Sequence, residues 1–288
     1  MKHGLTFVGV VLVLALCLTS CKGNSKSESN GVVDEPKKEV NIPTEYCEEL
    51  VKLAEEGNAE AQMNLAKCYV KGEGVERNFE EANKWLLKAA EQGNTDAMNE
   101  MGTAYLNGWG VPVDYKEAVK WYRKSAEQGN AVGQAQLGAC YGEGVGVPQN
   151  RKEAFNLFQK AAEQGDVIAQ KFLADYYLTG YATIGIPQDF DKAFDLYLKA
   201  AEQGLGPAQT QVGVCYMKGL GTSQNTSKAI EWLKKASETE PIALFNLGVI
   251  YINGEGGVSQ DIGQGLEYMR KAASLGHEGA KRALQMYQ

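Results

Sequence analysis

Few residues of this chain have the types and the spacing that catalysis or metal binding requires. Among its 288 residues there are only two histidines, and His3 lies in a segment that we expect to be removed. The mature chain would then keep His277 alone, which argues against a His-rich metal site and against a Ser-His-Asp triad. The sequence contains no Gly-x-Ser-x-Gly, His-Glu-x-x-His or Ser-x-x-Lys motif. We therefore predict no catalytic residues, no metal and no cofactor.

Glycine pairs separated by one residue recur along the chain and could suggest phosphate-binding loops. None follows a predicted strand, and none continues into the Gly-Lys-Ser/Thr of a P-loop. We interpret them as turns between helices, where glycine readily adopts a left-handed conformation. The pairs are Gly72/Gly74, Gly108/Gly110, Gly142/Gly144, Gly219/Gly221 and Gly254/Gly256.

Cysteines are the remaining reactive side chains. Cys68, Cys140 and Cys215 are too far apart along the chain's repeating pattern to bond to one another. Cys47 and Cys68 lie at similar distances on either side of Gly57, so a helical hairpin folded there would bring them to the same height. An oxidising compartment permits a disulfide between them. Two free thiols whose side chains point apart are the alternative.

The N-terminus has the features of a secretory signal. A basic start is followed by an uncharged stretch rich in Val and Leu, which is too short to span a bilayer as a helix. The stretch ends in Leu18-Thr19-Ser20-Cys21, which resembles the bacterial lipobox. By that resemblance, residues 1–20 are a lipoprotein signal peptide, and Cys21 becomes a lipidated N-terminus that anchors the protein in a membrane.

Residues 21–43 comprise the lipidated cysteine and a polar segment with too little apolar content to form a core, so we expect a flexible tether. Lys22, rather than Asp, follows Cys21, and by resemblance to bacterial lipoproteins this favours the outer membrane of the cell envelope. An ordinary signal peptide with a chance cysteine, or a short uncleaved anchor, are the alternatives.

One pattern recurs from Tyr46 onward and predicts the elements that position every other residue. A tyrosine followed by glycine three residues later returns at intervals of 35 to 39 residues, at Tyr69, Tyr105, Tyr141, Tyr177, Tyr216 and Tyr251. Each repeat holds two stretches with apolar residues at helical spacing, and glycine ends both. Such hairpins bury their apolar faces only by stacking on their neighbours.

The predicted fold is therefore all-α. We expect residues 44–288 to form an α/α superhelix, or solenoid, of about six 36-residue helix-turn-helix repeats with half-repeat caps, giving fourteen helices and no strands. The predicted repeats are 57–92, 93–128, 129–164, 165–203, 204–239 and 240–275.

The repeated residues resemble a known family. Gly-x-Ala-x-Ala-Gln-x-x-Leu, then Tyr-x-x-Gly-x-Gly-Val, then Lys-Ala-x-x-Trp-x-x-Lys-Ala-Ala-Glu-Gln-Gly is similar to the SEL-one-like repeat (SLR), a relative of the tetratricopeptide repeat. The resemblance covers about residues 45–288 and implies a non-enzymatic scaffold for protein–protein interaction. The fourth repeat departs from it by three extra residues around residues 180–187, and the sixth contains Pro241.

A partner of such a fold is expected on the wall that the first helices line. One equivalent row across the repeats is rich in amides and acids that can hydrogen-bond an extended peptide backbone. The row consists of Asn64, Glu100, Gln136, Phe172, Gln211 and Asn246. We predict a peptide groove centred on Phe172, Gln211 and Asn246, and a merely solvated helix face is the alternative.

Together these features predict a cell-envelope lipoprotein that acts as a non-enzymatic protein–protein interaction scaffold. Its partners are an unknown protein or peptide and, through Cys21, a membrane; the net charge of −7 disfavours nucleic acid. One alternative is a β-lactam- or peptidoglycan-binding protein or weak β-lactamase, as claimed for cysteine-rich relatives. Another is a regulatory lipoprotein that presents its domain to a membrane enzyme or transporter.

Overall fold

A computed structural model describes residues 42–287, which contain fourteen α-helices and no β-strand. The prediction of an all-α chain of helical hairpins is confirmed. The predicted signal peptide (1–20), Cys21 and the tether up to residue 41 lie outside the described residues. The helices are α2 (Glu48–Glu55), α3 (Ala59–Lys71), α4 (Phe79–Glu91), α5 (Thr95–Asn107), α6 (Tyr115–Glu127), α7 (Ala131–Glu143), α8 (Arg151–Glu163), α9 (Val167–Thr179), α10 (Phe190–Glu202), α11 (Gly206–Lys218), α12 (Thr226–Ala236), α13 (Pro241–Asn253), α14 (Ile262–Ser274) and α15 (Glu278–Gln285).

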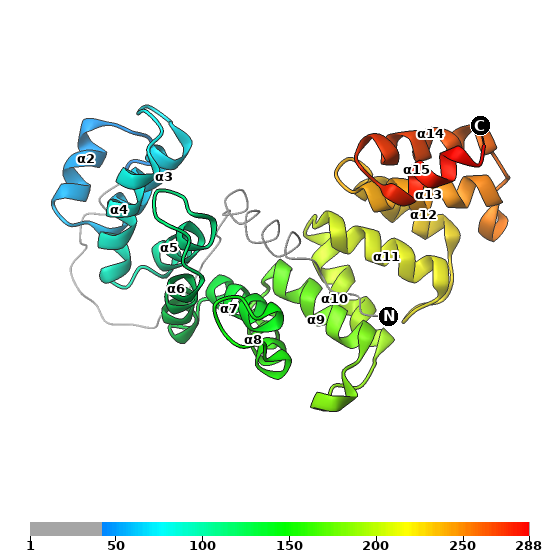
Figure 1. Ribbon diagram of the computed structural model, residues 1–288, viewed down its shortest axis with the longest axis horizontal. Coiled ribbons are helices and arrows are strands. Elements are labelled where there is room, and N and C mark those ends of the chain that lie inside the picture. The colour runs from blue at the N-terminus through cyan, green and yellow to red at the C-terminus, as the bar shows by residue number, and fades with distance from the viewer. Residues whose placement is uncertain (1–41, 288) are drawn as a thin grey trace, which may run out of the picture. The chain divides into compact units, whose positions relative to one another are not determined.

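The described part of the chain divides into two compact units at residues 157/158, and the division falls inside α8. In the first unit, each helix from α2 to α7 packs against the next one along the chain, and the same holds from α9 to α15 in the second unit (Figure 1). Helices α3, α5, α7, α9, α11 and α13 are the first helices of their repeats, and the helix that follows each of them is its second helix.

Most helices begin at an Asn or Asp that caps their free N–H groups. The Asn58 Oδ1 accepts a hydrogen bond from the Ala61 N–H at 2.9 Å, and the Asn78 Oδ1 accepts one from the Glu81 N–H at 3.0 Å. Later helices repeat this arrangement. Because these caps satisfy donors that the helix itself leaves unpaired, they define where each helix starts.

Left-handed glycines end the first helices. Gly72 has a φ of 75°, and its N–H donates to the Cys68 carbonyl oxygen at 2.8 Å. The interpretation of the glycine pairs as turns needs one correction. In the third repeat the left-handed pair is Gly144/Gly146 rather than Gly142/Gly144, because Gly142 lies within α7.

The second glycine of each turn allows one repeat to approach the preceding one. A Cβ added to Gly110 would lie 2.5 Å from the carbonyl carbon of Phe79, the first residue of α4. A Cβ at Gly146 would lie 2.1 Å from the carbonyl oxygen of Tyr115, the first residue of α6. Glycine is therefore required here for space as well as for its backbone conformation.

Large buried side chains fill the interface between the first and second helices of a repeat. Tyr122 of α6 and Tyr197 of α10 are each 0% exposed at equivalent positions of the two units. The Tyr122 hydroxyl is 3.0 Å from the Thr103 Oγ1, which satisfies its polar end. A Cβ at Gly102 would lie 2.6 Å from the Tyr122 ring, so a glycine opposite this tyrosine makes room for it.

Residues 42–46, here called the N-terminal strap, are irregular, with a bend at residues 44–45, and lie against the first hairpin before α2. The Asn64 Nδ2 donates to the Pro43 carbonyl oxygen at 3.1 Å, and the Cys68 Sγ donates to the Thr44 carbonyl oxygen at 3.8 Å. These two donors both lie on α3, so they hold consecutive carbonyls of the strap.

Apolar side chains of the strap complete the cover. Ile42 and Tyr46 pack against a buried cluster that includes Leu50 and Leu65. The Tyr46 ring meets the Tyr69 ring edge to face, with centroids 6.3 Å apart. Leu50 of α2 is 0% exposed as a result. The strap thus takes the place of the first helix that the α2 half-repeat lacks among the described residues.

The two irregular repeats are accommodated locally. In the fourth repeat the extra residues form a small turn, closed by an isolated bridge between Tyr181 and Ile186. The Tyr181 ring packs against the Tyr176 ring, with centroids 5.1 Å apart. In the sixth repeat Pro241 is the first residue of α13, a position where its missing N–H removes no helical hydrogen bond.

We predict that Gly146→Ala destabilises the protein more than Gly129→Ala. Both glycines have positive φ, 68° and 85°, so alanine strains the backbone by about 1–2 kcal/mol at either site. Only at Gly146 would the new Cβ also collide with the Tyr115 carbonyl, whereas nothing lies within 4 Å at Gly129. Urea unfolding of both variants measures the difference in the free energy of unfolding. Equal losses of stability would contradict a close backbone contact between Gly146 and Tyr115.

Candidate functional site

The six residues predicted to line a groove occupy one equivalent position, the sixth residue of each first helix, and are here called the first-helix row. Three of them, Asn64, Glu100 and Gln136, belong to the first unit. The other three, Phe172, Gln211 and Asn246, belong to the second unit. The surroundings of the row differ between the units.

In the first unit the row is mostly buried. Asn64 is 9% exposed and Gln136 is 5% exposed. The Asn64 amide is already engaged, because it donates to the Pro43 carbonyl of the strap. This helix position is therefore enclosed in the first unit, where burial limits the access of an incoming peptide to the two amides.

Glu100 is the one carboxylate of the row, and it is more than half buried on α5. Burial raises the pKa of its carboxyl group to about 7. The Lys67 ammonium on α3 opposes this rise, and the Asp96 carboxylate, one turn away on α5, adds to it. Glu100 therefore changes charge near neutral pH, where an ordinary surface glutamate is ionised.

In the second unit Phe172 belongs to a stacked apolar and cationic group. Its ring stacks on the Phe158 ring with centroids 5.0 Å apart, and the Lys171 Nζ lies 4.5 Å from the Phe172 centroid. The Lys171 Nζ is also 2.7 Å from the Asp175 carboxylate, which accepts a 2.5 Å hydrogen bond from the Tyr197 hydroxyl.

Sequence reasoning missed this polar network around Asp175. The spacing of Lys171 and Asp175 along α9 indicates an ion pair, because residues four apart share a helix face. The approach of Tyr197 from α10 is set by packing between helices and has no signature in the spacing. With both oxygens of its carboxylate engaged, Asp175 is a structural group rather than a catalytic one.

Gln211 on α11 and Asn246 on α13 are the two row residues that keep free hydrogen-bonding groups. Both are half-buried, and neither side chain hydrogen-bonds to any part of the chain that the structure describes. Helices α11 and α13 are in contact. Val214 and Val249 follow one turn after these amides, and Ile242, at the start of α13, is 52% exposed.

The four described cysteines are free thiols. Burial raises the pKa of the Cys140 thiol to about 12 and that of the Cys215 thiol to about 11. Burial is also the main cause of the raised pKa of the Cys68 thiol. Since the thiolate is the nucleophilic form, these three thiols are poorly suited to nucleophilic catalysis at neutral pH.

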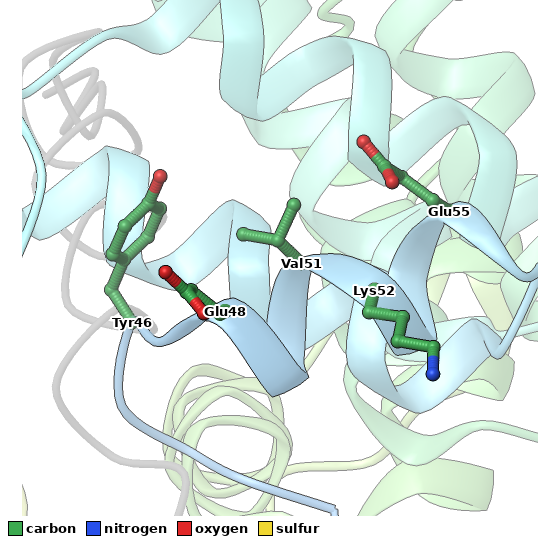
Figure 2. Close-up of a pocket in the computed structure, with 5 residues that line it drawn as sticks. All are labelled: Tyr46, Glu48, Val51, Lys52 and Glu55. Carbon is green, nitrogen blue, oxygen red and sulfur yellow. The ribbon is translucent and has the colours of Figure 1, made fainter.

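A surface hollow lies along α2. It has a volume of about 240 Å³ and is lined by Tyr46, Glu48, Val51, Lys52 and Glu55. Figure 2 shows the Lys52 ammonium pointing away from the Glu55 carboxylate, with Tyr46 and Glu48 at the other end of the helix. These groups do not converge on a common point, so the hollow does not have the arrangement of an active site.

Within residues 42–287 there is no group of three His, Cys, Asp or Glu side chains placed to hold a metal ion. The helices of the same region are all too short or too polar to cross a membrane.

We predict that Glu100→Gln raises the free energy of unfolding, relative to that of the wild type, more at pH 8 than at pH 5. A carboxyl group whose pKa is raised on folding holds its proton more tightly in the folded state, so the free energy of unfolding falls as the pH rises from about 4.5 to 7. The loss has an upper bound of about 3 kcal/mol, and glutamine removes it. Thermal unfolding across this pH range is the measurement.

The exposed Glu60→Gln on α3 is the matched control, because it removes the same charge without relieving a buried one. Parallel pH profiles for the wild type and Glu100→Gln would show that Glu100 is ionised without cost in the folded state.

Two solved structures are similar to the chain over most of its length. One is a protective antigen present in uropathogenic Escherichia coli strains that displays an SLR fold, with 36% identity, a TM-score of 0.69 and a match covering 82% of this chain and 50% of that one. The other is a Sel1 repeat protein from Oxalobacter formigenes, with 35% identity, a TM-score of 0.69 and coverage of 78% and 90%. The chain thus spans half the length of the first.

A shorter match joins the chain to a protein of Schizosaccharomyces pombe, chitin synthase regulatory factor 3. It has 34% identity over 73 residues, which is 25% of this chain and 8% of the yeast protein.

The Sel1 repeat model matches the chain six times, at residues 59–94, 95–130, 131–166, 167–205, 206–238 and 241–277. These matches cover most of the part of the chain that the structure describes and coincide with its helical hairpins. Sel1-repeat proteins typically act as protein-interaction scaffolds and are generally non-enzymatic modules. The repeated hairpins, the matching structures and the six family matches show together that this chain belongs to the Sel1 repeat family.

Proposed function

We propose that this protein is a lipid-anchored scaffold of the bacterial cell envelope that binds another protein through the first helices α11 and α13. The lipid is attached at Cys21, and the outer membrane is the membrane that carries it. The protein has no catalytic role of its own. Its partner is a protein or peptide that offers extended backbone and apolar side chains.

The pair of free amides, Gln211 and Asn246, carries this proposal. Half-buried amides without partners are able to hydrogen-bond a ligand's backbone in surroundings where water competes less. They lie on neighbouring helices, beside Val214, Val249 and the half-exposed Ile242. Peptide-binding surfaces combine amides, which orient the peptide backbone through hydrogen bonds, with apolar side chains, which bury the peptide's own apolar side chains.

The first unit does not offer the same chemistry. There the row amides Asn64 and Gln136 are buried, and the third member is the titratable Glu100. The neighbouring exposed positions carry charge, at Glu60 and Asp96. A charged, largely closed row binds an apolar segment less well than the second unit does.

The proposed location at a membrane of the cell envelope rests on the sequence alone. Leu18-Thr19-Ser20-Cys21 follows an uncharged stretch of signal-peptide length, and a polar segment separates Cys21 from the first helix. A lipidated terminus with such a tether would hold the repeats at a membrane surface, because several acyl chains anchor a protein stably where a single chain does not.

We predict that the double variant Gln211→Ala, Asn246→Ala lowers recovery of the partner at least fivefold. The reason is that two backbone hydrogen bonds of the complex are lost while the fold keeps its core. Crosslinking in intact cells, followed by purification and quantification of the crosslinked partner, is the measurement.

Gln264→Ala is the matched control, since Gln264 is an exposed amide on the second helix α14. Circular dichroism establishes that all variants keep their helices. Full recovery of the partner by the double variant would contradict binding at α11 and α13.

We predict that Cys21→Ser abolishes labelling of the protein by an alkyne-tagged palmitate in growing bacteria, because serine lacks the thiol that lipidation modifies. Cys17→Ser is the control, and it keeps the label because Cys17 lies within the predicted signal peptide. Label that persists in Cys21→Ser would rule out the lipid anchor at this residue.

A further inference from the structure

Two thiols lie together beneath the N-terminal strap. Cys47 follows directly after the strap, and Cys68 donates from α3 to the Thr44 carbonyl oxygen at 3.8 Å. Both cysteines belong to the apolar cluster around Leu50 and Leu65. Cys47 is close enough to Cys68 to contribute to the raised pKa of its thiol, behind the larger effect of burial.

The contacts that hold these sulfur atoms are weak. The Cys47 Sγ accepts from the Leu50 N–H at 3.4 Å, and the 3.8 Å contact of Cys68 is longer still. Moving either sulfur atom therefore gives up little hydrogen-bond energy. The strap is irregular backbone and belongs to no helix or sheet, so it can shift without breaking a regular hydrogen-bond ladder.

The two thiols differ in exposure, which sets the order in which they react. Cys47 is half-buried, whereas Cys68 is 1% exposed. A dissolved oxidant reaches Cys47 first, and Cys68 is the neighbour that can resolve the product.

We propose that Cys47 and Cys68 are a dithiol oxidation site whose disulfide ties Cys47, the residue that follows the N-terminal strap, to α3. The oxidant is a disulfide-bearing compound or protein. The Cys47 thiolate attacks one sulfur atom of that disulfide, forms a mixed disulfide and expels one thiolate. The Cys68 sulfur then attacks the Cys47 sulfur as its thiol loses its proton, and it expels the second thiolate. Two protein thiol protons are released, and two electrons reduce the oxidant to two thiols.

The other described cysteines lack this arrangement. Cys140 and Cys215 each lie in a buried cluster that contains no second described cysteine. They occupy the position of Cys68 in their own first helices, so they share its burial without having its neighbour.

Oxidation has a structural consequence at the strap. The strap is the link between the N-terminal segment and the first hairpin, and noncovalent contacts alone hold it in the reduced state. A disulfide closes the chain between residues 47 and 68, which removes conformations from the unfolded state and fixes the end of the strap beside α3. This inference does not depend on the proposed partner site, which lies on other helices.

The experiment treats the purified full chain with oxidised glutathione, blocks free thiols with iodoacetamide and digests it with trypsin. Cleavage after Lys38, Lys52, Lys67 and Lys71 isolates the two cysteines on separate peptides. We expect a linked peptide joining residues 39–52 to residues 68–71. We also expect a rise of several degrees in the unfolding temperature, reversed by dithiothreitol.

Cys47→Ser is expected to lose both the linked peptide and the rise, and it spares the more deeply buried Cys68. Cys140→Ala is the matched control and keeps both. The proposal is overturned if Cys47 remains in a mixed disulfide with glutathione while Cys68 is recovered alkylated, or if Cys47 crosslinks two copies instead. Partner recovery by α11 and α13 variants is unaffected by either outcome, so the two proposals are tested separately.

Discussion

Within each unit, close packing of a first helix against the second helix that precedes it is the constraint on which the rest of the structure depends. The third residue of nearly every first helix is a fully buried alanine: Ala61, Ala97, Ala169, Ala208 and Ala243. At the equivalent Gly133 even a Cβ would lie 2.5 Å from the Ser125 Oγ. Since each hairpin buries its apolar face only on its neighbours, stability is a sum of such contacts between successive repeats. The glycine turns serve the same contact, because they let successive repeats come together.

The same constraint explains which positions differ in chemistry between the two units. Faces that pack between helices are nearly the same in every repeat, so they carry no specificity. The remaining positions are free to differ. In the first unit they hold the strap through Asn64 and a buried, titratable Glu100. In the second unit they leave Gln211 and Asn246 unpaired beside apolar side chains. A scaffold of this kind gains its binding site from variation at exposed positions, without any change to the core.

The repeat pattern was sufficient to predict the helices, because the same residue types return at the same positions and helix caps and glycine ends have local causes. The candidate site was predicted less well. Alignment of repeats correctly placed Asn64 and Gln211 at one helix position, yet one amide is engaged by the strap and the other has no partner. That difference arises because the half-repeat at α2 has no preceding first helix among the described residues. The irregular strap packs there instead, which no periodicity in the sequence indicates.

Sequence alone determined the fold class, the number of repeats and the family, because all three follow from local preferences repeated in register. It also supplied the whole case for the lipid anchor, which lies in the residues before the first helix. Tertiary structure decided which residues of the row are buried, and that Cys47 and Cys68 lie in one cluster under the strap. These outcomes depend on contacts between segments distant along the chain, and spacing within a repeat carries no information about them.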